Sequence, residues 1–381
     1  MTTLFFSIAL LAVLSFFLRK PRPGETLAEQ QQDLQKLLER FAENPVLSPD
    51  PTHWWESKAV LNPAAVYAGG RVHLFYRAMG EDGMSRLGYA WSTDGIHFER
   101  LPYPVFEHES VAKARSHYPN TSPARLTYDT VNNESGGGWG GCEDPRGVVI
   151  DGRIYLTFNM FNGWDSMRVA YTSITTDDLL NRRWNWDKST YLCRDNRQKN
   201  WVLFPEKING KFALFYNLDK GDPTRVHIAY LDTLDMTQTP GADEALDPHK
   251  LPDHIVAWHH RTRSAATPPV KTKYGWLLFY HAMDKDDPDR YKLGVMLLDL
   301  ADPTKVLLRA ARPILEPNEW YENDWKPGII YATGAIVIDD DLLIYYGGGD
   351  KYIAVVRTNL HEFLEALKTH QQPTISLLVN K

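Results

Sequence analysis

Five segments of this 381-residue chain share one pattern, in which a glycine or an acidic turn is followed by an aromatic-rich apolar strand. They are GGRVHLFYRA (69–78), DGRIYLTFNM (151–160), NGKFALFYNL (209–218), YGWLLFYHAM (274–283) and DDLLIYYGGG (340–349). The third residues of successive copies are 82, 58, 65 and 66 positions apart. Repetition at this spacing predicts a fold that is assembled from similar modules.

Each copy lies between two further strand-like segments. The preceding segments carry proline or polar residues and are LNPAAVYA (61–68), CEDPRGVVI (142–150), LFPEKI (203–208), TPPVKTK (267–273) and ATGAIVI (332–338). The following segments are LGYAWS (87–92), RVAYTS (168–173), VHIAYL (226–231), LGVMLLDL (293–300) and IAVVRT (353–358). Such repeats are typical of propeller blades, whereas a two-sheet sandwich does not readily hold five equal copies. The sequence therefore predicts an all-β fold, a five-bladed β-propeller that forms the catalytic domain over residues 49–381.

The first 48 residues differ from this body. Residues 4–18 form an uncharged apolar run of marginal length for a spanning helix, and Arg19, Lys20 and Arg22 follow it. By the positive-inside rule, we expect residues 1–20 to be a membrane anchor that leaves the catalytic domain in the cytoplasm; export is the alternative. Residues 21–48 are expected to be a linker with one amphipathic helix over about 25–43, since apolar side chains recur there at helical spacing.

Composition narrows the classes of function. With 48 acidic and 42 basic residues the net charge is −6, which argues against a general nucleic-acid binder. Two cysteines, Cys142 and Cys193, predict neither a disulfide framework nor a zinc site, and we expect no metal or cofactor. The chain has 12 Trp, 19 Tyr and 15 Phe, and we interpret pairs such as Trp54-Trp55 and Trp184/Trp186, and likewise Trp320-Tyr321, as packing between strands.

Polar residues recur where the second strand of each repeat ends. These equivalent positions are Arg77, Asn159, Asn217, His281 and Gly347. The first strands add Asn62, Glu143, Asp144, Arg146 and Glu206. Polar side chains at a repeated position predict a ligand surface at one mouth of the central channel. A carboxylate held next to Pro145 and Arg146 is suited to acid–base chemistry, although an ordinary ion pair in a tight turn would give the same local pattern.

The ordered motifs resemble glycoside hydrolase family 130, the β-mannoside phosphorylases and related hydrolases, over about residues 45–365. They are NPAA (62–65), YRA (76–78), GCEDPR (141–146), KNWVLFPE (199–206), PPVKT (268–272), GWLLFYH (275–281) and YYGGGD (345–350). The resemblance implies a five-bladed propeller and an inverting enzyme that acts on β-linked manno-oligosaccharides and uses inorganic phosphate as a co-substrate.

The resemblance also implies roles for single residues. Asp144 matches the general acid, which is thought to deliver its proton through a hydroxyl of the bound sugar. The positions that match phosphate ligands are Arg77, Lys199, His281 and Arg263. Those that we expect to bind the sugar are Asn62, Glu143, Arg146, Asn217 and Asp350.

One departure from the family pattern keeps a second chemistry open. Many phosphorylases carry His-Arg where this chain has Tyr216-Asn217, and loss of a bidentate guanidinium weakens phosphate binding. An inverting β-mannosidase with Glu206 or another carboxylate as base is therefore the alternative. A non-catalytic carbohydrate-binding propeller is disfavoured by the cationic positions. Linkage, chain length, acceptor sugar and oligomeric state stay open.

Overall fold

The computed structural model describes residues 37–108, 140–161, 167–193, 198–216, 226–234, 245–246, 258, 261–310 and 312–369. Within these ranges the regular secondary structure is almost entirely β-strand, which confirms the all-β prediction. The helices with bounds in the described chain are α4 (Thr176–Leu180), α5 (Leu360–Thr369) and the short 3-10 turn η3 (Trp320–Glu322).

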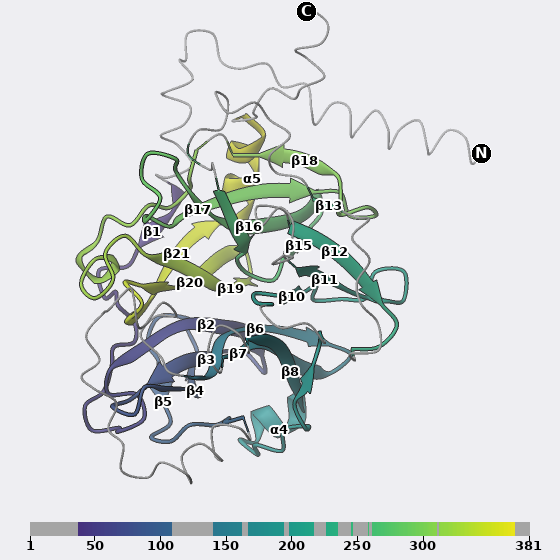
Figure 1. Ribbon diagram of the computed structural model, residues 1–381. Coiled ribbons are helices and arrows are strands. Elements are labelled where there is room, and N and C mark those ends of the chain that lie inside the picture. Colours follow the sequence, from purple (N-terminus) through teal and green to yellow (C-terminus); the bar gives the residue numbers. More distant parts are fainter. Residues whose placement is uncertain are drawn as a thin grey trace, which may run out of the picture.

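Five antiparallel meanders make up the body (Figure 1). Their strands, in chain order, are β2 (Ala59–Ala68), β3 (Arg71–Met79) and β4 (Met84–Ser92); β6 (Gly140–Ile150), β7 (Arg153–Phe161) and β8 (Arg168–Thr175); β10 (Val202–Leu203), β11 (Phe212–Tyr216) and β12 (Val226–Leu231); β14 (Arg261–Ala265) with β15 (Val270–Thr272), β16 (Gly275–Met283) and β17 (Lys292–Leu298); and β19 (Ile330–Ile338), β20 (Asp341–Gly348) and β21 (Tyr352–Asn359). The middle strand of each meander coincides with one of the five repeated segments.

A short fourth strand lies at the outer edge of every meander. These strands are β5 (Glu99–Arg100), β9 (Thr190–Tyr191), β13 (Ala245–Leu246), β18 (Val306–Arg309) and β1 (Glu39–Arg40), which pair with β4, β8, β12, β17 and β21 respectively. Since β1 pairs with β21, the start of the described chain completes the last meander.

Residues 25–36 of the predicted helix over 25–43 lie outside the described part of the chain, and the prediction is wrong at residues 39–40, which form a strand. Its predicted apolar face is nevertheless used, because Leu38 is buried in the core of the last two meanders and Leu37 packs against the same core. Strand pairing and the bidentate contact of Arg40 with buried Glu322 replace helical hydrogen bonds there. Folded structure consequently begins ahead of residue 49, the predicted boundary.

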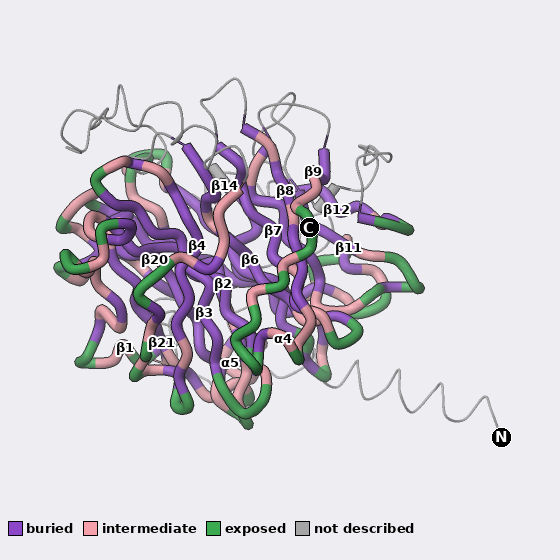
Figure 2. The backbone as a smooth tube through the Cα atoms, turned by 90° about the horizontal axis from the view of Figure 1, so that it is seen from below, coloured by how far each residue is buried: buried purple, intermediate pink, exposed green. Residues whose placement is uncertain are grey.

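The meanders pack face to face, which explains why their middle strands are apolar on both sides. On β20, Leu342, Ile344 and Tyr346 face the fourth meander, whereas Leu343 and Tyr345 join the core of the first. The strands are buried along most of their length, and exposed positions gather in the turns (Figure 2).

The first strands of the meanders lie toward the middle of the molecule (Figure 1). β2 contacts both β6 and β19, and β6 contacts β10. The predicted anchor over 1–20 lies outside the described residues. Within the described part of the chain, the model contains no helix that is both long and apolar enough to cross a membrane.

The tryptophan predictions are confirmed only in part. Trp55 is fully buried, and Trp184 and Trp186 pack against the core of the first two meanders. Trp54 and Trp320 are instead 54% and 60% exposed, so these two rings are not packed between strands.

Candidate active site

The candidate acid, Asp144, projects from a β-bulge near the start of β6. The register of β6 against β7 shifts between Glu143 and Arg146, and Asp144 has a φ of 50°. Bulges re-aim side chains, and a residue in the left-handed region is strained unless its surroundings hold it there. The bulge turns the Asp144 carboxylate out of the strand's regular alternation.

A register shift recurs in three of the four other first strands. The register shifts between Leu61 and Ala64, between Thr262 and Ser264, and between Ala332 and Gly334. Asn62 lies within the first of these bulges with a φ of 49°, so it is the counterpart of Asp144. The bulges of β2 and β6 bring the side chains of Asn62 and Asp144 together.

Two donors hold the Asp144 carboxylate. The Nδ2 amide of Asn62 donates to Oδ1 at 2.6 Å, and the guanidinium of Arg77 donates to the same oxygen at 3.3 Å. No described residue donates to Oδ2, and the side chain is 13% exposed. One oxygen is thus fixed by the protein while the other is left for a ligand.

Arg77 joins the two neighbouring carboxylates. Its guanidinium donates to Glu143 at 2.9 Å, and its Nε donates to the hydroxyl of Ser85 at 2.9 Å. Burial opposes the charged form, but the carboxylates of Glu143, Asp144 and Asp350 outweigh it and raise the pKa of Arg77. Arg77 therefore remains a buried cation between the first two meanders.

The fifth meander contributes Asp350 and Gly347. Asp350 is buried, has a φ of 53° and accepts an ion pair from Lys326 at 3.2 Å. A Cβ atom on Gly347 would lie only 2.0 Å from Oδ1 of Asn62. Glycine at this position is what allows Asn62 to reach Asp144.

Arg146 connects the backbone at Asp144 to the fourth meander. Its guanidinium is buried and donates to the carbonyls of Ala266 at 3.0 Å and Asp144 at 2.9 Å. It also lies against Tyr331, whose hydroxyl accepts a longer hydrogen bond of 3.5 Å. That Arg146 binds the sugar stays a prediction; its described hydrogen bonds fix the backbone at Asp144 and Ala266.

His281 packs against Tyr331 of β19. The two rings are stacked with centroids 4.1 Å apart, and His281 is fully buried. Burial also raises the pKa of Tyr331. That His281 binds phosphate stays a prediction.

The position of Lys199 is set by the next residue, Asn200, which is hydrogen-bonded to Asn159 of β7. Asn159 accepts from the backbone amide of Asn200 at 2.8 Å and donates to its side chain at 3.1 Å. Asn159 is the β7 partner of Glu143, so half-exposed Lys199 lies at the same end of the meanders as Asp144. Asn217 and the side chain of Arg263 lie outside the described part of the structure, although Arg263 itself occupies the bulge of β14.

Glu206 is at the wrong end of its meander to act as the base. It lies in the hairpin turn beyond β10, is 44% exposed and pairs with Lys271 at 2.6 Å. The adjacent Lys207 pairs with Asp151, which belongs to the hairpin turn of the second meander. Among the described residues, no group of three or more His, Cys, Asp or Glu side chains could hold a metal ion.

The sequence reasoning missed Ser85, Asn200, Lys326 and Tyr331. Each supports one of the residues that it did find, through a contact between meanders or across a turn. The left-handed asparagines and aspartates are the signal that could have found the bulges, because Asn and Asp are enriched at positive φ.

Comparison with known proteins identifies the family of the chain. Residues 129–369 match a family profile described as beta-1,4-mannooligosaccharide phosphorylase. A 1,2-beta-oligomannan phosphorylase from Thermoanaerobacter sp. (strain X514) is 36% identical over 84% of this chain and 96% of its own. A beta-1,2-mannobiose phosphorylase from the same organism is 34% identical with the same coverage.

A solved structure shares the fold. A glycosyl hydrolase from Bacteroides ovatus superimposes with a TM-score of 0.65 and 26% identity, over 84% of this chain and 92% of the other. The profile covers more than half of the chain, and relatives above 30% identity span most of it. On this evidence the chain belongs to glycoside hydrolase family 130.

Proposed function

We propose that this protein is an inverting β-mannoside phosphorylase that converts β-linked manno-oligosaccharides and inorganic phosphate into mannose 1-phosphate and a shortened chain. The two relatives from Thermoanaerobacter, both named for β-1,2-linked substrates, support a β-1,2 linkage. The five meanders are proposed to be the blades of a five-bladed propeller, because the first strands contact one another in the middle and β1 completes the last meander.

Phosphorolysis, rather than hydrolysis, is supported by the surroundings of the other described carboxylates, which are paired with cations or lie far from Asp144. Glu143 is buried and paired with Arg77, Asp350 is paired with Lys326, and Glu206 lies in a remote turn. A water nucleophile needs a carboxylate base, and an inverting hydrolase places it about 6.5–9.5 Å from the acid. Among the described residues around Asp144 none is left for that role. Phosphate is already an anion and needs only cations that hold it.

Asp144 is proposed to be the general acid. As the bond between the anomeric carbon and the leaving oxygen breaks, the Asp144 proton moves to that oxygen, directly or through a sugar hydroxyl. A phosphate oxygen attacks from the opposite face, so the β-mannoside yields an α-phosphate. Asn62 and Arg77 hold Oδ1 throughout and stabilise the carboxylate that forms.

Lys199 is proposed as the accessible phosphate ligand. It is half-exposed at the end of the meanders where Asp144 lies, whereas Arg77 and His281 are buried. Arg263, as the bulged residue of β14, is positioned by the same irregularity that aims Asp144 and is proposed as a second ligand. Asn217 can donate a hydrogen bond from its amide but carries no charge, so we propose phosphorolysis with a weakened affinity for phosphate.

The test is consumption of β-1,2-mannobiose by the full chain with and without inorganic phosphate. We expect turnover to require phosphate and to saturate as phosphate rises. Equal turnover in phosphate-free buffer would identify a β-mannosidase instead.

A further inference from the structure

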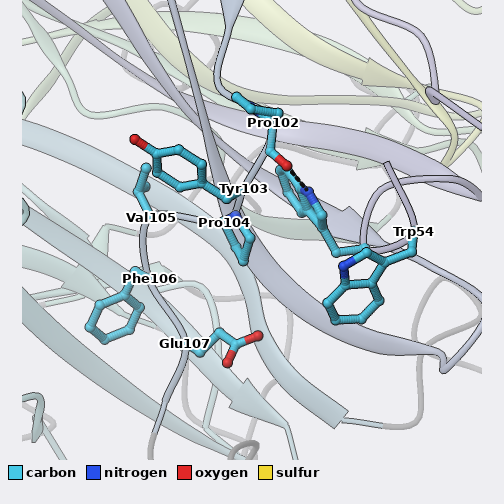
Figure 3. A pocket seen from close by; sticks show the side chains of 8 residues that line it. Trp54, Pro102, Tyr103, Pro104, Val105, Phe106 and Glu107 are labelled. Carbon is cyan, nitrogen blue, oxygen red and sulfur yellow. Dashed lines mark hydrogen bonds between the residues drawn. The ribbon is translucent and has the colours of Figure 1, made fainter. Parts of the chain in front are cut away.

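A pocket that Asp144 does not line lies at the outer edge of the first meander, beside β4 and β5 (Figure 3). Its volume is about 440 Å³. The residues that line it are Trp54, Trp55, Pro102, Tyr103, Pro104, Val105, Phe106 and Glu107.

The walls of this pocket are tied together. The indole of Trp55 donates to the carbonyl of Pro102 at 3.0 Å, which joins the segment before β2 to the segment after β5 (Figure 3). A Cβ atom on Gly80 would lie 1.9 Å from the Trp54 carbonyl oxygen, so the backbone of Trp54 packs directly on the β3–β4 turn. The pocket is preformed, as small-molecule sites usually are.

Its lining combines exposed rings with charge. Trp54 is 54% exposed and Tyr103 is 49% exposed, whereas Trp55, Trp201 and Trp276 are fully buried. The guanidinium of Arg86, itself completely buried, lies 4.8 Å from the centroid of the Trp54 ring.

Arg86 also ties the pocket to polar groups. It donates to Glu107, which lines the pocket, and to Asp82 at 2.5 Å. An aromatic platform that is fixed from behind and bordered by a carboxylate suits a pyranose ring. The C–H face of the sugar would pack on the ring, and its hydroxyls would donate to the carboxylate.

The pocket is connected to the acid through β4, because Ser85 and Arg86 of this strand contact Arg77 and Trp54 respectively. Ser85 accepts from Arg77 and is followed directly by Arg86, the residue beneath Trp54. The pocket wall runs along β4, since the amide of Val105 donates to the Leu87 carbonyl. It is therefore about two strand spacings, roughly 10 Å, outward from Arg77 on β3. A single sugar ring is too short to span that separation, so the ligand that reaches both Asp144 and this pocket is an oligosaccharide.

We propose that this pocket binds a distal sugar unit of a β-manno-oligosaccharide whose scissile end lies at Asp144. The proposal rests on the proposed function for its substrate class. It assigns to Trp54 and Tyr103 the recognition of chain length, not a part in the reaction itself.

The experiment measures phosphorolysis of β-1,2-mannobiose and β-1,2-mannotetraose by the full chain and by Trp54→Ala, Trp54→Phe and Trp320→Ala. Trp320→Ala is the matched control, because Trp320 is an equally exposed indole on another meander. We expect Trp54→Ala to raise the KM for the tetraose roughly three- to tenfold, the worth of one aromatic contact, and to leave the KM for the biose unchanged. Trp54→Phe should restore most of the loss.

Three results would overturn the proposal. They are an unchanged KM for the tetraose in Trp54→Ala, an equal rise for both substrates, and an equal effect of Trp320→Ala. A changed sedimentation coefficient in Trp54→Ala with unchanged kinetics would make the pocket an interface between copies, which also contradicts it. Calorimetric binding of the tetraose to the wild type and Trp54→Ala in phosphate-free buffer keeps the two proposals apart, because it tests the pocket even if phosphorolysis is absent.

Discussion

The side-chain amide of Asn62 lies 2.6 Å from Oδ1 of Asp144, although the two residues are 82 positions apart and belong to different meanders. Both have a φ close to 50°, both precede a proline and both lie in a bulge at the start of a first strand. The site is thus made by one backbone irregularity that is repeated around the fold and filled with different side chains.

Removing the acid should abolish most turnover without unfolding the chain. We expect Asp144→Asn to lower kcat by about 10²–10⁴, the usual contribution of general acid catalysis. Asp151→Asn is the matched control, since Asp151 has the same φ of 50° but lies in a hairpin turn at the other end of the meander. Near-normal kcat in Asp144→Asn would remove this residue from the mechanism.

Two substitutions of Asn62 should separate strain from chemistry. Alanine loses the amide, and without a short polar side chain it adopts the left-handed region at a cost of about 1–2 kcal/mol, whereas glycine tolerates that conformation. Both variants lose the donor to Asp144, so we expect kcat to fall roughly tenfold or more in each, the worth of a hydrogen bond to a charged group. Thermal unfolding should distinguish them, with the larger loss for Asn62→Ala. Recovery of kcat in Asn62→Gly would show that strain, and not the amide, is what matters.

The proposed role of Lys199 as a phosphate ligand can be tested by comparing the KM for phosphate with the KM for mannobiose. We expect Lys199→Ala to raise the KM for phosphate by about tenfold or more, as for a lost charge-assisted contact, and to leave the KM for mannobiose unchanged. Lys207→Ala serves as the control, because Lys207 is a partly exposed lysine paired with Asp151 at the other end of the meander. A rise in the KM for mannobiose alone would assign Lys199 to the sugar.

The repeated strands were predictable because each carries its signal locally. Turn residues followed by an apolar run located all five middle strands, and β12 was predicted at its exact bounds, 226–231. The predicted equivalence of the second-strand ends is also confirmed. Each pairs with a residue at or next to the irregular start of a first strand, and the four described positions are Arg77, Asn159, His281 and Gly347.

The predictions that failed concern residues whose positions depend on contacts between distant segments of the chain. β1 pairs with β21, more than 300 residues later, so the helical periodicity that predicted a helix up to residue 43 was misleading at residues 39–40. The apolar run that predicted a helix gave no hint of this pairing. Glu206 shares a motif with Lys199, yet the strand between them carries it to the opposite end of the meander, a separation that the sequence alone does not reveal.

Closure of the last meander should depend on one buried ion pair. Glu322 is fully buried and accepts from Arg40 of β1, so Arg40→Ala leaves this carboxylate without its cation, with only the Tyr346 hydroxyl and the Glu319 amide as described donors. We expect a loss of about 3–5 kcal/mol in the free energy of unfolding, measured by chemical denaturation. The neighbouring pair of Arg357 with Glu39 is exposed, and Arg357→Ala should cost less than about 1 kcal/mol. Equal losses in the two variants would contradict the closure argument.

The most direct test of phosphorolysis with Asp144 as acid is a time-resolved phosphorus NMR measurement on the full chain with β-1,2-mannobiose and inorganic phosphate. The account predicts a growing signal of α-mannose 1-phosphate that matches mannobiose consumption one to one and is almost absent in Asp144→Asn. Free mannose from both halves of the disaccharide, with no loss of the inorganic phosphate signal, would contradict it.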